Sequence, residues 1–347
     1  MISSTLAPAS TRTRTRGAPV ELVLNNILLV ALLLLGLYFA LHSSAFLTLS
    51  NINVLLTNYA AIGVVAAIMA LLVIAGQVDL SVGSNIAFSG MITALAMTSW
   101  GMPAGVGVLL GLLSGAAVGL VNGVLCAYLN FSPIIVTLGM LSVLRGATLL
   151  INPIEVSGLG DTFFSIGNGS VFGAPILLIV VFAVFMLSAG FLSLTVWGRY
   201  VFAIGVNRQA AFLAALPVRS VLLGLFIATG AAAGASGVLL VARLDGASPG
   251  SLGLQMELQA LTIVLLGGVA FAGGRGRILG VFIAWVFLGV LDNGLTLLNV
   301  PPFVQLVASG LALVFAASLD ALGAFLGPRL EERRRVAEQL ADAKSDA

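Results

Sequence analysis

The feature that most constrains this chain is the length of its uncharged apolar runs. No charged residue occurs between Glu21 and Asp79, which leaves room for two helical spans of about 20 residues each. Only 8% of the 347 residues are charged and 60% are hydrophobic, whereas a soluble domain carries about 25% charged residues. Because backbone polar groups inside a bilayer must be satisfied internally, the sequence predicts an all-α integral membrane protein.

Ten apolar segments follow one another, and we expect a polytopic bundle of about ten transmembrane helices. The segments lie at about 22–42, 52–74, 82–100, 104–128, 133–151, 174–196, 219–241, 258–273, 278–298 and 303–325. The expected organisation is a tail at 1–21, a transmembrane domain at 22–325 and a second tail at 326–347. The first segment follows an arginine-bearing stretch and is similar to a signal peptide, but its length favours a retained span.

Basic residues predict the orientation of the bundle. With ten spans, both termini lie on the same side of the membrane. If that side is the cytoplasm, the outer loops hold only Arg243, while Arg145 falls within a span. The inner regions then hold Arg12, Arg14, Arg16, Arg199, Arg208, Arg219, Arg275, Arg277, Arg329, Arg333, Arg334, Arg335 and Lys344. This asymmetry predicts a multi-pass protein of the inner membrane with both termini cytoplasmic.

Glycines recur at helical spacing in two of the segments. The ridge in 104–128 has a glycine at every fourth position, and 219–241 repeats the device. The residues are Gly107, Gly111, Gly115, Gly119 and Gly123, then Gly230, Gly234 and Gly237. Because lipid gives no hydrophobic drive between helices, small residues that allow close backbone approach predict tight helix packing here.

Several functions are disfavoured by residue usage. A phosphate-binding loop needs a lysine after its glycines, and the only lysine is Lys344 in the tail. His42 and Cys126 are single residues of their types, so neither a metal site nor an internal disulfide is expected. Net charge is only +2, with the basic residues spread over separate loops, so nucleic acid is a poor partner. We expect no catalytic residues and no cofactor.

Polar residues interrupt the apolar runs at three places. Asp79 and Ser81 lie in the turn between the second and third segments. One interpretation is that one of them caps the new helix. The other is that the turn enters the bundle and helps gate or line a pathway. Asp292 and Asn293 lie in the ninth segment, at the outer surface or at a functional site. Arg145 lies in the fifth segment.

Acidic residues on the outer side could neutralise Arg145. Glu155 and Glu257 are the two candidates. Uncharged polar residues suit the lining of a path for a neutral hydroxylated solute, although each one alone is as well explained by a helix–helix contact. They are Asn122, Asn130, Ser132, Thr137 and Ser142.

The central stretch 195–220 carries three arginines and no acidic residue. Asn207 is a suitable N-cap for a short helix from Gln209 to Leu216, which Pro217 ends. Such a helix on the basic side is either a surface for a cytoplasmic partner or a solvated loop whose arginines fix the orientation.

Four blocks resemble one family, the permease subunits of ATP-binding-cassette importers for monosaccharides of the ribose, xylose, arabinose and rhamnose type. Some members of that family import the autoinducer-2 signal instead. The likeness extends over about residues 50 to 325 in consistent order. The blocks are VDLSVGS at 78–84, PIIVTLGMLSVLRG at 133–146, GRYVFAIGVNRQAA at 198–211, and ELQALTIVLLGGVAFAGGRGRILG at 257–280 with DNGLTLL at 292–298.

The resemblance implies an assembly of two permeases, as identical copies or siblings, with two ATPase subunits and a periplasmic sugar-binding protein. ATP hydrolysis would occur on the partner chain. The 198–211 block would couple to the ATPase through Arg199, Gly205, Asn207, Arg208, Gln209, Ala210 and Ala211. The pathway or gate would involve Asp79, Ser81, Asn122, Thr137 and Asn293.

Three departures from the family pattern affect these expectations. Gln209 stands where the family usually has Glu, so a neutral hydrogen bond would replace a charged contact. Ala215-Leu216-Pro217 replaces Ser-Gly-Ile, and Gln259 replaces a common acid.

Two further functions stay open. One is a stand-alone secondary transporter that couples to an ion through Asp79, Arg145 or Asp292. The other is a membrane scaffold without a transported solute.

Overall fold

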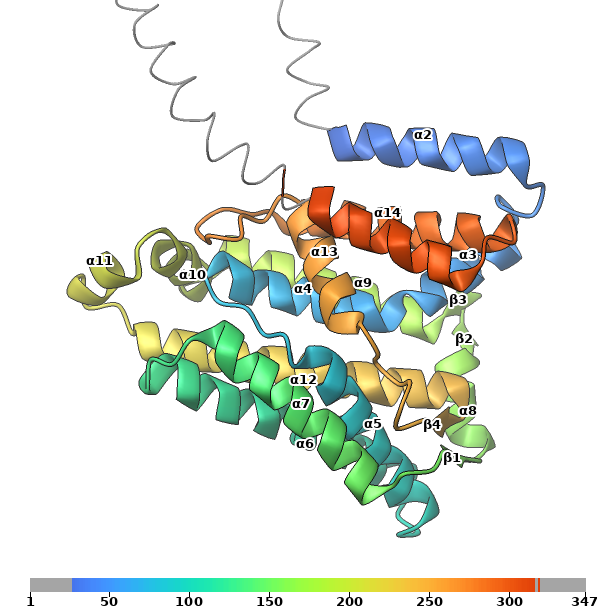
Figure 1. Cartoon of the computed structure of the whole chain (residues 1–347), viewed down its shortest axis with the longest axis horizontal. Helices are drawn as coiled ribbons and strands as arrows, with labels where there is room; N and C mark the ends of the chain where they lie inside the picture. Colours follow the sequence, from blue (N-terminus) through green and yellow to red (C-terminus); the bar gives the residue numbers. More distant parts are fainter. Residues whose placement is uncertain (1–26, 316–317, 319–347) are drawn as a thin grey trace, which may run out of the picture.

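The computed structural model describes residues 27–315 and 318. The predicted tails at 1–21 and 326–347 therefore lie outside the described residues, as does the end of the tenth apolar segment. The described part of the chain is mainly helical, with four two-residue strands (Figure 1), which confirms the all-α class.

Each of the ten predicted apolar segments contains a described helix. The helices are α2 Ile27–His42, α3 Leu49–Asn58, α4 Ala60–Ile74, α5 Val82–Thr98, α6 Ala104–Gly123, α7 Pro133–Ile151, α8 Asp161–Asn168, α9 Ile176–Leu194, α10 Val196–Val206, α11 Arg208–Leu213, α12 Val218–Leu244, α13 Met256–Leu266 and α14 Ile278–Leu297. A π-helical turn, Val124–Tyr128, extends α6, and a further apolar helix spans Pro302–Phe315.

Four two-residue strands form two small antiparallel pairs. Strand β1 (Val156–Ser157) pairs with β4 (Gly246–Ala247), with Val156 opposite Ala247. Strand β2 (Ser170–Val171) pairs with β3 (Ala174–Pro175). These pairs and α8 lie together at one end of the bundle, and α10 and α11 lie at the opposite end (Figure 1).

Five described helices are long and apolar enough to cross a membrane: Ala104–Tyr128, α7, α9, α12 and α14. A sixth span results if α3 and α4, which are bent by 50° at their junction, are counted together. The helices α5 and α13 have only 17 and 11 residues. At about 1.5 Å per residue, α13 is too short to cross a bilayer by itself.

The predicted glycine ridges meet each other. Helices α6 and α12 run side by side (Figure 1). A Cβ added to Gly115 would lie 2.5 Å from the carbonyl oxygen of Gly230, and one added to Gly234 would lie 2.7 Å from that of Gly111. Any larger residue would push the two backbones apart, so the predicted close packing is confirmed.

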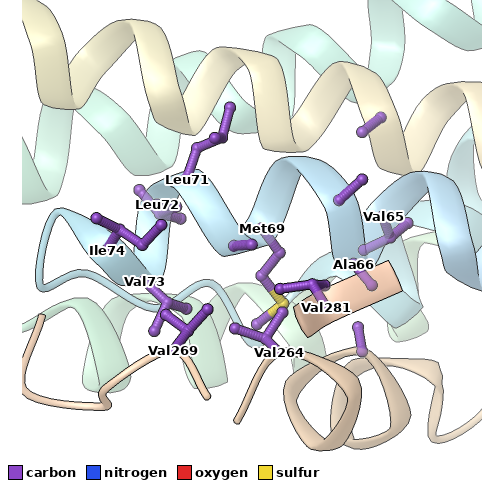
Figure 2. Packing of buried hydrophobic residues seen from close by; sticks show 14 of the residues in the cluster. Val65, Ala66, Met69, Leu71, Leu72, Val73, Ile74, Val264, Val269 and Val281 are labelled. Carbon is purple, nitrogen blue, oxygen red and sulfur yellow. The ribbon is translucent and has the colours of Figure 1, made fainter. Parts of the chain in front are cut away.

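Helix α4 forms the apolar centre of the bundle. Met69, Leu72 and Ile74 are fully buried, and they pack with Val264 of α13 and Val281 of α14 (Figure 2). The connection that follows α4 is also interior, since Gln77, Val78 and Asp79 are all buried.

Candidate functional site

A buried polar cluster lies where the chain passes from α4 to α5. Asp79, Ser81 and Asn122 come from two distant parts of the sequence, and all three are at most 1% exposed. One carboxylate oxygen of Asp79 accepts hydrogen bonds from the Ser81 amide at 2.9 Å and from the Ser81 hydroxyl at 2.6 Å. The side-chain amide of Asn122 donates to the other oxygen at 3.2 Å and to Ser81 Oγ at 2.9 Å.

The backbone explains this arrangement. Ser81 precedes the first residue of α5 but its side chain does not cap the helix, and Asp79 accepts the free Ser81 amide instead. A carboxylate is favourable there because the N-terminus of a helix carries partial positive charge. The cap interpretation and the pathway interpretation of this turn are therefore compatible.

Some hydrogen-bonding capacity at the cluster is unused. Among the described residues, Asn122 Oδ1 and Ser84 Oγ are buried without a partner. Buried polar groups are normally paired, so these two atoms could exchange bonds with a polar solute or water. The cluster therefore keeps hydrogen-bonding capacity that the described protein does not use.

The short helices α5 and α13 begin beside each other. A Cβ on Gly83, in the first turn of α5, would lie 2.7 Å from the carbonyl oxygen of Gly253, just before α13, and would also collide with the Glu257 carboxylate. One Glu257 oxygen is buried without a hydrogen-bond partner in the described structure. Two helix starts with flanking carboxylates therefore meet inside the bundle.

The other two predicted pathway residues lie apart from this cluster. Thr137, on α7, is buried and donates to the carbonyl of Pro133 in its own helix at 2.8 Å. Asn293, on α14, exchanges two hydrogen bonds with Asn51 of α3, at 2.8 and 3.0 Å. The Asn293 contact therefore joins α14 to α3, and the Thr137 contact lies within α7.

Asp292 belongs to the junction of α3, α4 and α14. The hydroxyl of Tyr59, the residue between α3 and α4, donates to its carboxylate. Trp285 Nε1 donates to the Tyr59 carbonyl at 2.8 Å, and the same carbonyl also accepts the Gly63 amide of α4 at 3.0 Å. Asp292 is thus held by protein contacts, while its second oxygen is buried without a partner among the described residues.

Arg145 is bound mainly by backbone. Its guanidinium donates to the carbonyls of Leu252 at 2.9 Å and Pro249 at 3.5 Å. Of the two acids that the sequence suggested, Glu257 exerts an electrostatic attraction on it. Arg145 therefore fixes the 249–252 connection to α7.

The central stretch folds as two short helices. Thr195 caps α10 by accepting the Gly198 amide at 3.0 Å, and Asn207 caps α11 by accepting the Ala210 amide at 2.9 Å. Helix α10 is absent from the sequence prediction. Helix α11 begins one residue earlier than predicted and ends at Leu213 rather than Leu216. It ends early because Ala215 adopts a left-handed conformation (φ 58°).

The outward face of this unit is partly apolar. Phe212 is 60% exposed and Leu213 is 78% exposed, whereas Ala211 is buried at 6%. Gln209, Ala210 and Arg199 are exposed. A shallow cavity of about 320 Å³ is lined by Asn130, Arg208, Gln209, Phe212, Val218 and Arg219.

Gly205 joins the central stretch to the bundle. A Cβ at this position would overlap the carbonyl of Ile74 and the amide of Gly274. The Gly274 amide also donates to the Ile74 carbonyl at 2.8 Å. The end of α10, the end of α4 and the 267–277 connection therefore meet at one backbone junction, five residues before Asp79 in the chain.

Sequence reasoning missed Tyr59 and Asn85. Asn85 Nδ2 donates to the carbonyls of Gly115 at 3.2 Å and Gly230 at 3.4 Å, at the α6–α12 crossing. Its position four residues after Ser81, on the same helical face, was an available signal. The described residues contain no group of three or more His, Cys, Asp and Glu side chains that could hold a metal.

Comparison with known proteins decides the family. A family model described as "Branched-chain amino acid transport system / permease component" matches residues 50–317. The chain belongs to this permease family. It is therefore a transport component and a multi-pass helical membrane protein.

Curated relatives agree with this membership. The L-arabinose ABC transporter permease protein of Azospirillum brasilense is 37% identical over 320 residues, covering 91% of each chain. The ribose import permease protein of Escherichia coli K12 is 33% identical and covers 84% of this chain and 92% of its own length. The autoinducer 2 import system permease of Yersinia pestis is 32% identical, with 85% and 89% covered. No solved structure matches significantly.

Proposed function

We propose that this chain is the membrane-spanning subunit of an ATP-binding-cassette importer for a monosaccharide or a similar polyhydroxylated solute. The names of the relatives, which include arabinose, ribose and autoinducer 2 permeases, support this substrate class. The observation that carries the proposal is the α10–α11 unit, which projects from one end of the bundle (Figure 1) and exposes Phe212 and Leu213. Exposed apolar side chains beside arginines fit a protein partner.

The end that bears α10 and α11 faces the cytoplasm in this proposal. Arg199 lies on α10, Arg208 and Arg219 line the cavity at α11, and Arg275 and Arg277 follow Gly274 at the junction. The positive-inside tendency favours this end as cytoplasmic. Residues 1–21 and 326–347 would then be cytoplasmic tails of a transmembrane domain at 22–325 in the inner membrane.

The partner at this end is a separate ATPase subunit. Gln209, Ala210, Phe212 and Leu213 form the docking surface, with Arg208 and Arg219 beside it. Asn207 and Ala211 support this surface from within, since Asn207 caps α11 and Ala211 is buried. The opposite end, with α8 and the short strands, receives the periplasmic sugar-binding protein, and a second permease copy or sibling completes the membrane part.

Movement of the docked helix reaches the interior through Gly205. Its tight contact with Ile74 and Gly274 leaves no space to absorb a shift of α10. A rigid displacement of α10–α11 on ATP binding therefore moves the end of α4 and the connection to Asp79. This is a rigid-body switch driven by differential binding of nucleotide to two states.

The Asp79, Ser81 and Asn122 cluster forms the gate in the pathway. Its unpartnered amide oxygen and the neighbouring Ser84 hydroxyl offer bonds to solute hydroxyls. Thr137 contributes to the pathway wall from α7, and Asn293 holds α14 against α3.

Reconstitution tests the proposal. The chain with its ATPase and binding protein should take up a labelled monosaccharide into liposomes only with ATP. Uptake by the isolated chain, driven by an ion gradient without ATP, would instead establish a secondary transporter.

A further inference from the structure

A second cavity, distinct from the one at α11, lies at the opposite end of the bundle. It has a volume of about 460 Å³ and is lined by the end of α12, the connection from β4 to α13 and Glu155. Three of its lining residues have polar side chains, namely Glu155, Ser248 and Ser251. None of these side chains forms a hydrogen bond within the described part of the chain.

The rest of the lining is apolar and includes Leu240, Leu252 and Met256. A carboxylate and two hydroxyls facing an apolar wall match a monosaccharide, whose hydroxyls need acceptors and donors while its C–H face packs on apolar side chains. The volume falls within the range of small-molecule pockets, about 300–1,000 Å³.

We infer that this cavity is a receiving site for a neutral monosaccharide before translocation. The inference rests on the proposed function and adds a site to it. Glu155 accepts hydrogen bonds from solute hydroxyls, and Ser248 and Ser251 donate or accept further ones. Because the site's one charged side chain is a carboxylate, it disfavours anionic solutes such as sugar acids and sugar phosphates.

The connection 248–255 forms much of the wall of this cavity. Arg145 holds it from α7 through the carbonyls of Leu252 and Pro249. Gly253 (φ 67°) lies against the backbone of Gly83, too close for a side chain. Just before this connection, the Asp245 carboxylate accepts a hydrogen bond from the Leu159 amide at 2.9 Å. The connection that lines the cavity is therefore fixed both to α7 and to the first turn of α5.

Equilibrium binding to the purified permease–ATPase complex, without the binding protein, tests this site. The probes are labelled L-arabinose, D-ribose, D-xylose, D-allose and L-rhamnose, and the probe transported fastest by the full system is taken forward. We expect saturable binding to the unaltered complex. Glu155→Gln should raise its Kd about tenfold, equivalent to about 1.4 kcal/mol, and Ser251→Ala should raise it less.

Asp161→Asn is the matched control, because Asp161 is a carboxylate at the same end of the bundle and does not line the cavity. Its Kd should be unchanged. The receiving site is refuted if the full system takes up the sugar with ATP but the permease–ATPase complex alone shows no saturable binding. It is also refuted if Glu155→Gln binds the sugar as tightly as the unaltered complex. In both cases the importer assignment stands. Absence of ATP-driven uptake refutes the importer assignment itself.

Discussion

Replacing Gly205 by Ala tests how the cytoplasmic helices act on the bundle. The added Cβ would overlap the Ile74 carbonyl and the Gly274 amide, which are backbone groups and cannot rotate away. The 2.8 Å hydrogen bond from Gly274 to Ile74 lies at the same point. We expect α10 to separate from α4, so that ATPase docking persists while transport is lost.

The energetic cost follows from these contacts. Overpacking costs about 1–3 kcal/mol, and rigid neighbours favour the upper half of that range. A weakened hydrogen bond adds about 1 kcal/mol. Alanine gains about 1 kcal/mol over glycine inside a helix, which offsets part of the loss. The net destabilisation should be about 2–3 kcal/mol.

Gly224→Ala is the control, since Gly224 is also helical and a Cβ there meets nothing within 4 Å. The assays are thermal unfolding of the purified chain and ATP-driven uptake by the reconstituted complex. Gly224→Ala should keep uptake and be at least as stable as the unaltered chain, because alanine is favoured over glycine inside a helix. Equal stability of the two variants, or normal transport by Gly205→Ala, would contradict the tight contact at Gly205.

Two further predictions concern the interior. Asp79→Asn keeps an acceptor for Ser81, and Asn122 can turn its free oxygen towards the new amide, so assembly should be normal. Uptake should fall at least tenfold if the charge serves the pathway. Normal uptake would show that Asp79 acts only as a helix cap. Gly115→Leu should destabilise the chain by about 3 kcal/mol in thermal unfolding, because its side chain meets the Gly230 carbonyl. Gly139→Leu, with open space at its Cβ, should not, and equal stability of the two would contradict the ridge packing.

The sequence was most informative where local physics decides structure. Apolar length located most of the described membrane helices to within a few residues, but α13 ends at Leu266, seven residues before the predicted end of its segment at 273. The four-residue glycine spacing anticipated the α6–α12 contact, and Asn207 anticipated the start of α11 within one residue, since capping depends on a single side chain. The family likeness rested on motif blocks spread along the chain.

What the sequence did not predict depends on contacts between distant residues. The segment 52–74 suggested one span, but it bends by 50° at Tyr59, whose carbonyl accepts a hydrogen bond from Trp285, 226 positions away. Arg145 suggested an ion pair, but its main partners are loop carbonyls. The meeting of Asp79 with Asn122 likewise depends on how α5 and α6 pack. Residue type shows that such groups need partners but does not show which partners they find.

Thiol accessibility at position 209 tests whether α11 faces the cytoplasm and docks on the ATPase. Gln209→Cys places a thiol on exposed α11, while the native Cys126 is fully buried and should not react. With the ATPase present, the new thiol should crosslink to that subunit, and an impermeant reagent should label it only from the cytoplasmic side. Labelling from the periplasmic side would refute the proposed orientation. Full labelling from the cytoplasmic side, with no protection or crosslink when the ATPase is bound, would refute the docking of α11 on the ATPase.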